Sequence, residues 1–452
     1  MITLGRRSGF LLFAGDLVAF AASLYLTLAL RYLTVPTAAM LAPYWLPFAF
    51  LFALWLLVFY GAGLYGKQFL LFPSRLPDAL LKTQGANILF AAVFFFLLPV
   101  FGIAPKTILA LYLLVSLALT LLWRLALYPK LSARPRRERA VLVAEGAEAD
   151  DLYQELNGNA RYGIEFCARP YGDSLADPEK FLTEIRGHGA SIIVADTNSA
   201  QAAALMPLIY DLTRARGEYQ FAAFEDFYEE VFDRIPLSQL GHVWFLEHVT
   251  AEDALFYAVM KRAIDLVGGF VMGIITAVVA PFIWVANLFE GGGPLFIAQE
   301  RFGRYGSLVR TYKFRSMKEN DAGAWKGESN NYVTKVGAFL RRTSLDEFPQ
   351  FLNVLKGEVS LVGPRNDIIA LGARLEEALP YYEARYLVTP GITGWAQINQ
   401  RYEPGNASPQ SIEETKVRLA YDFYYLKHRS LGLDIVIALK TVKRMFFRVS
   451  SW

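Results

Sequence analysis

The chain has 452 residues, of which 54% are hydrophobic, 15% aromatic and only 19% charged. This composition is too apolar for an ordinary soluble protein and indicates a membrane protein, while the formal net charge of +3 gives no sign of a nucleic-acid partner. The single cysteine, Cys167, permits no intrachain disulfide and indicates a reducing compartment, and four histidines without paired spacing argue against a zinc site.

Four apolar stretches within residues 1–130 predict an α-helical bundle of four membrane spans: 9–30, 44–64, 85–101 and 107–127. Lysine and arginine gather before the first stretch, between the second and the third, and after the fourth. The positive-inside rule places these three regions in the cytoplasm, which is consistent with four spans and both ends inside. Asp16 lies within the first stretch, and packing between helices is preferred over a functional role for it.

Residues 138–249 have the composition of a soluble domain. Short β-type runs at 140–146 and 191–197 are each followed by helix-like sequence, which predicts βαβ units and a Rossmann-like α/β fold with a small parallel sheet. The turn after the first run, EGAEAD, lacks the glycines that let a pyrophosphate approach a helix N-terminus. We therefore expect a regulatory or packing domain without a bound dinucleotide.

Residues 264–289 form a further apolar segment that is long enough to cross a membrane, with Pro281 inside it. Proline removes a backbone hydrogen bond and clashes with the preceding turn, so the segment should bend there. Lys261 and Arg262 precede it and several basic residues follow it, so both flanks favour the cytoplasm. We predict a re-entrant helix-break-helix hairpin that enters one leaflet and returns, with a kinked fifth span as the alternative.

A basic, strand-like run follows this segment, with Lys313 and Arg315 alternating with Tyr312 and Phe314. On a strand both cations would share one face, because successive side chains point to opposite sides. That face could clamp a diphosphate, or it could be a solvated or lipid-headgroup-facing edge.

The stretch from 341 to 365, RRTSLDEFPQFLNVLKGEVSLVGPR, places two adjacent carboxylates at a helix start. Apolar residues recur at helical spacing after them, and Gly357 closes the helix as a left-handed cap would. Ser344 and Glu347 fit a capping box, whereas Pro349 favours a first turn that begins one or two residues later, so the register stays open. Asp346 and Glu347 should both remain ionised in either register, and for an isolated pair capping alone would be the simpler explanation.

Two features remain towards the C-terminus. The loop at 388–401 is dense in proline and glycine, and its Trp395 is as readily a packing residue or interfacial anchor as a ligand contact. The last twenty residues form an amphipathic helix whose cations, among them Lys440 and Arg444, suit an anionic membrane surface.

The region from Lys261 to the end carries a series of motifs: KRAIDLVGG, GGPLFIAQERFGRYG, YKFRSM, SLDEFPQFLNVLKGEVSLVGPR, PGITGWAQIN and YDFYYLKHRSLGLD. In content and order they resemble the bacterial monotopic phosphoglycosyl transferases, also called polyprenyl-phosphate hexose-1-phosphate transferases. The whole chain is similar to the large form, with four spans (1–130), a Rossmann-like domain (138–249) and a mostly α-helical catalytic domain (255–452). Asn366 and Gln400 depart from the family pattern, which usually continues GPRP and NGR at these points.

The resemblance implies transfer of a sugar 1-phosphate from a UDP-sugar, expected to be UDP-glucose or UDP-galactose, to undecaprenyl phosphate with release of UMP. It implies Asp346 as nucleophile through an aspartyl-phosphosugar intermediate, and Glu347 with Asp346 at a Mg²⁺ site. It further implies phosphate or nucleotide contacts at the following residues: Lys313, Arg341 and Arg365, with Arg315 and Asp422 as additional candidates.

The implied setting is the cytoplasmic face of the bacterial inner membrane, in exopolysaccharide, capsule or O-antigen synthesis, with surfaces available for a homodimer. Two other functions remain open. A membrane-bound nucleotide-sugar dehydratase would need a dinucleotide glycine fingerprint and a Tyr-x-x-x-Lys pair, and a non-catalytic scaffold for polysaccharide export would need neither.

Overall fold

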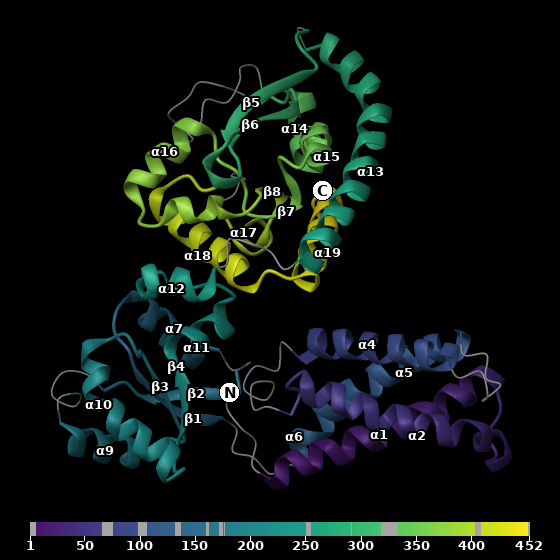
Figure 1. Ribbon diagram of the computed structural model, residues 1–452, viewed down its shortest axis with the longest axis vertical. Coiled ribbons are helices and arrows are strands. Elements are labelled where there is room, and N and C mark those ends of the chain that lie inside the picture. Colours follow the sequence, from purple (N-terminus) through teal and green to yellow (C-terminus); the bar gives the residue numbers. More distant parts are fainter. Residues whose placement is uncertain are drawn as a thin grey trace. The chain divides into compact units, whose positions relative to one another are not determined.

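A computed structural model describes residues 6–65, 76–97, 106–131, 137–159, 162–170, 175, 177–249, 255–290, 292–317, 333–402 and 408–450 (Figure 1). The chain divides into two compact units, Met1–Val231 and Phe232–Trp452.

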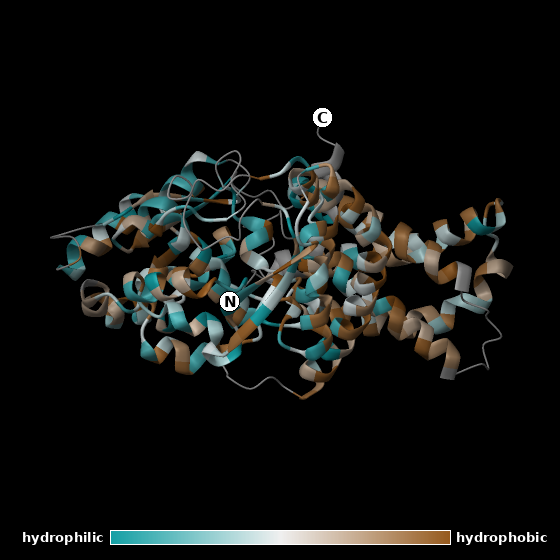
Figure 2. Ribbon diagram, turned by 90° about the horizontal axis from the view of Figure 1, so that it is seen from above, coloured by the Kyte–Doolittle hydropathy of each residue, from teal (hydrophilic) through white to brown (hydrophobic). Residues whose placement is uncertain are grey.

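The first unit begins with long apolar helices: α1 (Arg6–Tyr32), α2 (Ala38–Gly61), α4 (Leu76–Leu97) and α5 (Lys106–Leu122), the last continuing through the π-helix η3 (Trp123–Leu127) into α6 (Tyr128–Leu131). Each predicted span coincides with one of them over the residues that the structure describes, while the end of the third span, 98–101, lies outside those residues. Each helix is long and apolar enough to cross a bilayer. Hydrophobic residues predominate along these helices, to the right in Figure 2. An aromatic cluster that includes Phe20, Phe48 and Trp55 fills their core.

Asp16 packs between helices, as the sequence analysis preferred. Arg124 Nε donates to Asp16 Oδ1 at 2.9 Å, a second guanidinium nitrogen reaches Oδ2, and both side chains are buried. Because an unpaired charge would be costly in an apolar setting, the pair ties α1 to η3.

The rest of the first unit is a parallel sheet in the order β2-β1-β3-β4, formed by β1 (Glu138–Val143), β2 (Ile164–Ala168), β3 (Ile192–Ala195) and β4 (Gln220–Ala223). Helices follow the strands in turn: α7 (Ala147–Gly158), α9 (Pro178–Gly187), α10 (Ala200–Tyr210) with the π-helix η4 (Asp211–Ala215), and α11 (Phe224–Phe232). The sheet is therefore built from the predicted βαβ units, and four consecutive residues of β1 are buried, as in a sheet covered on both faces.

The second unit is mostly helical. Its helices are η5 (Leu237–Gln239), α12 (His242–His248), α13 (Leu255–Leu288), η6 (Arg304–Gly306), α14 (Lys335–Thr343), η7 (Leu345–Gln350), α15 (Phe351–Lys356), α16 (Ile369–Ala378), η8 (Tyr382–Leu387), α17 (Trp395–Asn399), α18 (Ile412–His428) and α19 (Leu431–Ser450). Two small sheets complete it, an antiparallel pair of β5 (Phe296–Phe302) with β6 (Leu308–Phe314) and a parallel pair of β7 (Ser360–Val362) with β8 (Gly391–Thr393).

The hydrophobic core of this unit reaches upstream of the predicted boundary at residue 255. Trp244 on α12 lies in one buried cluster with Phe423 and Trp395. Trp395 also donates from its indole nitrogen to the Asp233 carbonyl at 2.8 Å and stacks on Tyr424, so it is a packing residue. The unit thus begins near residue 232.

The helix break predicted within residues 264–289 is absent from the structure. α13 is one continuous helix through Pro281. A proline removes a single backbone hydrogen bond, and the other bonds of a 34-residue helix persist around it. Glycines on α13 allow close packing: a Cβ at Gly269 would come within 3.1 Å of Val354, and one at Gly273 within 3.0 Å of Phe351. The helix therefore lies against α15 along one face.

Candidate active site

A cavity of about 230 Å³ in the second unit brings together most of the predicted site residues. It combines an ionic wall with a wall of hydroxyl, amide and apolar side chains. Its lining residues are Lys313, Arg341, Ser344, Asp346, Glu347, Phe348, Arg365, Ile392, Thr393, Gln397, Ile398, Tyr402, Thr441, Arg444 and Met445.

A tight turn between α14 and α15 presents the acidic pair. Ser344 ends α14 in the left-handed region, with φ at 57°, and the 3₁₀ turn η7 follows at once and carries Asp346 and Glu347. Of the two registers that the sequence left open, the capping box at Ser344 is not formed: this residue closes α14 and directly precedes η7, and its side chain makes no capping hydrogen bond. Gly357, with φ at 86°, ends α15 as predicted.

Glu347 is held by two cations. Lys313 Nζ lies 2.9 Å from Glu347 Oε1, and Arg365 Nη1 lies 3.0 Å from Oε2 while its Nη2 contacts Oε1. Burial alone would raise the pKa of Glu347, but Arg365 and Lys313 outweigh burial and hold that pKa well below its usual range. Both oxygens of this carboxylate are therefore committed to an ion-pair cluster.

Asp346 has a different environment although it is the neighbouring residue. No described residue donates a hydrogen bond to its carboxylate, which lines the cavity and is 8% exposed. Burial, followed by the nearby charge of Glu347, raises the pKa of Asp346 to about 6, against the opposing effect of Lys313 and Arg365. At neutral pH the Asp346 carboxylate is thus mostly ionised and available for another partner.

The cavity as a whole is positive. Arg341 on α14 and Arg444 on α19 add to Lys313 and Arg365, so four cationic side chains face two carboxylates. The excess of two positive charges matches a diphosphate that is esterified at both ends, which carries two negative charges at neutral pH.

Three other predicted residues lie outside this cavity. Arg315 follows β6, and its Nη2 donates to the Gly292 carbonyl, so Lys313 and Arg315 do not form one clamp. Asp422 on α18 is fully buried and accepts from Arg385 Nε at 2.7 Å. Pro281 lies within α13 and does not line the cavity.

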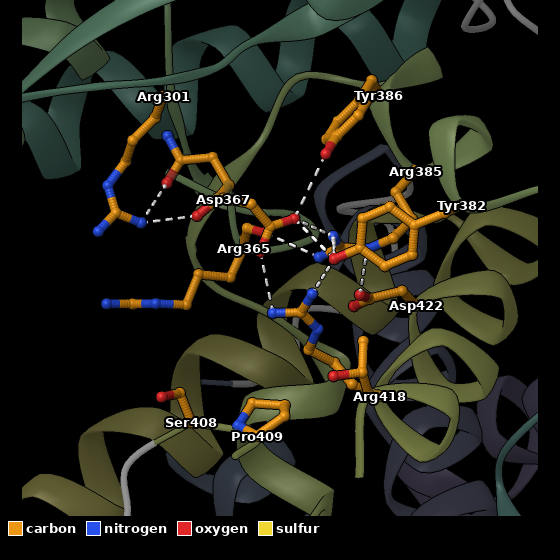
Figure 3. A network of polar contacts seen from close by, with 12 residues as sticks. Arg301, Arg365, Asp367, Tyr382, Arg385, Tyr386, Ser408, Pro409, Arg418 and Asp422 are labelled. Atoms are coloured by element: carbon orange, nitrogen blue, oxygen red, sulfur yellow. Dashed lines mark hydrogen bonds and ion pairs between the residues drawn. The ribbon is translucent and has the colours of Figure 1, made fainter. Parts of the chain in front are cut away.

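A buried ionic network supports the loop that carries Arg365 (Figure 3). Asp367 pairs with Arg418 at 3.0 Å and with Arg385, and it accepts from the Tyr382 hydroxyl at 2.8 Å. Arg385 also binds Asp422, so two guanidinium groups and two carboxylates balance one another. Burial would raise the pKa of Asp367, but Arg385 and Arg418 hold it well below its usual range.

Arginine side chains also donate hydrogen bonds to the backbone of this loop. Arg385 Nη2 donates to the Arg365 carbonyl at 2.7 Å, and Arg301 Nη1 donates to the Asn366 carbonyl at 2.7 Å. Figure 3 shows the Arg365 side chain extending away from the network, and this side chain reaches Glu347. Asp422 and Arg385 are therefore positioning residues behind the cavity.

The sequence analysis missed several residues of the site. Arg385 and Asp367 gave no signal in sequence, because a buried arginine cannot be told from a surface one before its partner is known. Arg444 was assigned to a membrane surface, whereas its Nη1 donates to the Gln397 carbonyl beside the cavity. Of the two departures from the family pattern, Gln400 is buried and donates to the Glu414 carbonyl at 2.7 Å.

Asp346 and Glu347 are the residues that the family resemblance implies as ligands of Mg²⁺. Within the described residues no group of three or more His, Cys, Asp or Glu side chains could hold a metal ion. Mg²⁺ is commonly bound by one or two carboxylates, with waters and substrate phosphates completing its shell. Asp346, which accepts no hydrogen bond from a described residue, therefore fits an ion that arrives with a diphosphate. Glu347 would add to the shell only through the lone pair of Oε2 that its bonds with Lys313 and Arg365 leave over.

Comparison with known proteins places the C-terminal region among characterised sequences. Residues 256–448 match the family described as Bacterial sugar transferase. The chain is 34% identical over 190 residues to UDP-N-acetylgalactosamine-undecaprenyl-phosphate N-acetylgalactosaminephosphotransferase of Aeromonas hydrophila, covering 41% of this chain and 44% of the relative. It is 38% identical over 196 residues to UDP-glucose:undecaprenyl-phosphate glucose-1-phosphate transferase of Escherichia coli (strain K12), covering 43% and 41%.

A shorter relative is matched over nearly its whole length. The exopolysaccharide production protein PSS of Rhizobium leguminosarum bv. phaseoli is 34% identical over 191 residues, which are 41% of this chain and 94% of the relative. The matches to the two longer relatives span less than half of their length. The similarity is thus concentrated in the unit that holds the cavity.

Proposed function

Because the chain belongs to the bacterial sugar transferase family, we propose that it transfers a sugar 1-phosphate from a UDP-sugar to undecaprenyl phosphate and releases UMP. The names of the Aeromonas and Escherichia relatives support the reaction class. The observation that carries the proposal is the asymmetry of the acidic pair: Glu347 is bound by two cations, whereas Asp346 faces a positive cavity without a hydrogen-bond donor.

The proposed reaction has two displacements at one phosphorus atom. An Asp346 carboxylate oxygen attacks the phosphorus that carries the sugar, and the bond from this phosphorus to the bridging oxygen breaks, with the electron pair leaving on UMP. A phosphate oxygen of undecaprenyl phosphate then attacks the same phosphorus. The bond to Asp346 breaks, which regenerates the carboxylate and gives the lipid diphosphate sugar. Neither step requires a net proton transfer.

The cations of the cavity offset the negative charge of the diphosphate, so an anionic nucleophile is repelled less when it approaches the phosphorus atom. Lys313 and Arg365 are fixed by Glu347, so their donors are already oriented when a diphosphate arrives. Arg341 and Arg444 lie on other elements of the lining and add charge for the phosphates. When Mg²⁺ is bound by Asp346 and Glu347 together with the substrate, it supplies further neutralisation of the diphosphate.

The contacts of α13 support a catalytic unit that sits on one side of the membrane. Near its start, Lys261 Nζ lies 2.8 Å from Asp434 Oδ2, and just beyond its end Glu290 accepts from the Val336 N–H at 3.1 Å. Both ends of the helix thus contact one unit, while apolar side chains between them, such as Phe270 and Phe282, are exposed. We propose that α13 enters the cytoplasmic leaflet of the inner membrane and keeps both ends on the cytoplasmic side.

A labelling experiment tests this topology. Tyr257 lies in the first turn of α13 and Ser307 lies beyond its end, and cysteines placed at both positions should react from the cytoplasmic side in a chain whose Cys167 is replaced by serine. Reaction from opposite sides would establish the kinked fifth span instead.

Covalent catalysis is tested by intact mass measurement. The purified chain incubated with a UDP-sugar and no lipid acceptor should gain the mass of one sugar phosphate, and Asp346→Asn should not. Glu377→Gln, an exposed carboxylate on α16, is the matched control and should still form the adduct. An adduct on Asp346→Asn would remove Asp346 as the nucleophile.

UMP release across a panel of UDP-sugars identifies the donor. We expect UDP-glucose or UDP-galactose, and the Aeromonas relative's name makes UDP-N-acetylgalactosamine a necessary member of the panel. The product would start an exopolysaccharide, capsule or O-antigen glycan, and size measurement in detergent tests the proposed homodimer. No UMP release with any donor would favour the scaffold function.

A further inference from the structure

The uncharged wall of the candidate active site has no part in the proposed displacements. Its hydroxyl groups come from Thr393 on β8, from Tyr402 and from Thr441 on α19. Ile398 and Met445 add apolar surface. In the proposed reaction the sugar stays bonded to the reacting phosphorus through both displacements, whereas UMP leaves after the first. The cavity must therefore accommodate the sugar in both steps.

Two of these hydroxyl groups belong to a chain of hydrogen bonds that ends on the backbone. Thr441 Oγ1 donates to the Ile437 carbonyl at 2.8 Å, and it lies 2.8 Å from Thr393 Oγ1. A hydroxyl group has a single hydrogen, so both contacts are hydrogen bonds only if Thr393 donates to Thr441. Neither threonine then has a hydrogen left for a ligand, while each oxygen keeps at least one lone pair that can accept.

The hydroxyl group of Tyr402 is committed in the same way. It donates to Gln400 Oε1 at 3.0 Å, and Gln400 Nε2 in turn donates to the Glu414 carbonyl at 2.7 Å. Gln400 is buried, so this amide is held at both ends. The hydrogen of Tyr402 therefore points to Gln400, and its oxygen keeps lone pairs for another donor.

The charges around Tyr402 indicate where its oxygen lies. Burial raises the pKa of Tyr402 to about 12, whereas Arg418, Arg365 and Arg444 oppose that rise. Arg418 belongs to the buried network that includes Asp367, and Arg365 and Arg444 line the cavity, as Tyr402 itself does. The oxygen thus lies where the network meets the cavity, and the hydroxyl group keeps its hydrogen at neutral pH.

The three hydroxyl groups of the wall therefore offer a ligand acceptors and no donors. Phosphates and the carbonyl groups of a nucleobase are acceptors themselves, so they form no hydrogen bond with these oxygens. A sugar has a hydroxyl group on most of its carbons, and its C–H groups suit the apolar side chains of Ile398 and Met445. A few polar groups on an apolar wall are sufficient to orient a small ligand in a pocket.

We propose that this wall binds hydroxyl groups of the transferred sugar, with the oxygens of Tyr402 and Thr393 as acceptors and Gln400 as the residue that positions Tyr402. The proposal rests on the proposed function, because that function brings a sugar phosphate into the cavity. Gln400 stands where the family pattern usually has glycine, which has no side chain to accept from Tyr402. The orientation of the Tyr402 hydroxyl group thus depends on a residue that departs from the pattern.

The test is equilibrium binding to the full chain in detergent, measured by isothermal titration calorimetry in a chain that carries Asp346→Asn to prevent turnover. The ligands are UDP, which lacks the transferred sugar, and whichever of UDP-glucose, UDP-galactose and UDP-N-acetylgalactosamine binds most tightly. Tyr402→Phe and Thr393→Val each remove one hydroxyl group at nearly constant shape. Each should weaken binding of the UDP-sugar about tenfold, the effect of one lost hydrogen bond, and leave binding of UDP unchanged.

Two comparisons separate positioning from packing. Gln400→Gly should weaken binding of the UDP-sugar about as much as Tyr402→Phe does, and it should add nothing in the double variant, because Gln400 acts through Tyr402. Tyr312→Phe, on β6 and outside the cavity lining, is the matched control and should bind both ligands as the parent chain does. Far-ultraviolet circular dichroism of each variant excludes unfolding as the cause of lost binding.

Unchanged binding of the UDP-sugar by both Tyr402→Phe and Thr393→Val would overturn the site. Equal weakening of UDP and UDP-sugar binding would assign the wall to the nucleotide and would overturn the proposal as well. A chain that binds the UDP-sugar as expected but, with Asp346 restored, releases no UMP would count against the proposed transferase and leave the sugar site standing.

Discussion

Replacing Asp346 by asparagine should abolish the proposed covalent adduct and, at the same time, stabilise the second unit at neutral pH. Asp346 lies in a buried cavity beside Glu347, and burial and that neighbouring charge raise its pKa from 3.8 to about 6. An ionised carboxylate with a raised pKa is less favourable in the folded chain than in the unfolded chain. Asparagine has nearly the same shape and no charge, so the substitution removes this cost.

The size and the sign of the effect follow from linkage. A shift of about two pKa units corresponds to about 3 kcal/mol between the two protonation states. Between pH 3.8 and about 6 the folded chain binds more protons at this position than the unfolded chain, so this contribution to stability falls as pH rises. Above pH 6 the full cost is present, whereas below pH 4 the carboxyl is neutral in both states.

The assay is native-state hydrogen exchange of the most protected backbone amides in the second unit, compared between the wild type and Asp346→Asn. We expect Asp346→Asn to be more stable by about 3 kcal/mol at pH 8, with the difference vanishing towards pH 4. Asp226→Asn, in the first unit, controls for a general effect of the substitution. A variant that is less stable than the wild type at pH 8, or a difference that does not change with pH, would refute the reasoning.

Three further outcomes follow from the same contacts. Adduct formation should be half-maximal near pH 6 on the acid side, because the proposed mechanism requires the ionised form of Asp346 as nucleophile, and a flat rate from pH 5 to 8 would contradict this. Arg365→Met should move that midpoint to higher pH, because Arg365 lowers the pKa of Asp346, whereas Arg365→Lys should leave it near 6; equal midpoints for both variants would exclude this role. Arg385→Met should cost about 3–5 kcal/mol, because it leaves Asp422 buried without its cation and Asp367 with Arg418 alone, and this lowers the melting temperature by about 10 °C. The exposed Arg374→Met should change the melting temperature little.

The features that the sequence predicted well are those encoded within a few residues. Spans such as α1 and α5 follow from long, mainly apolar runs, and strands β1 and β3 follow from short apolar runs typical of β-strands, since each pattern depends on neighbouring side chains alone. Gly357 ends α15 for the same reason, because a left-handed cap is a local property of the backbone. The acidic pair and its neighbouring cations were also found in sequence, through the pattern of the motifs.

Local patterns were less reliable where two of them competed. Ser344 and Glu347 have capping-box spacing, yet Ser344 closes α14 in the left-handed conformation and its side chain makes no capping hydrogen bond to η7. Pro281 was expected to break a helix, and α13 continues through it because the hydrogen bonds of the other residues hold. At Ser344 and at Pro281 the sequence contained one signal for a helix end and another for a continuing or starting helix, and the local pattern alone could not choose between them.

The sequence by itself determined the membrane helices, the parallel sheet and the chemical character of the stretch around Asp346. Only the tertiary structure decided that Glu347 is bound by two cations while Asp346 faces the cavity without a hydrogen-bond donor. Lys313 and Arg365 approach Glu347 from positions 34 and 18 residues away, and a network that includes Arg385 and Asp422 holds the loop that brings Arg365 there. The physical reason is that the energy of a charged side chain depends on the charges and the solvent around it in space, and these are established only when distant segments pack together.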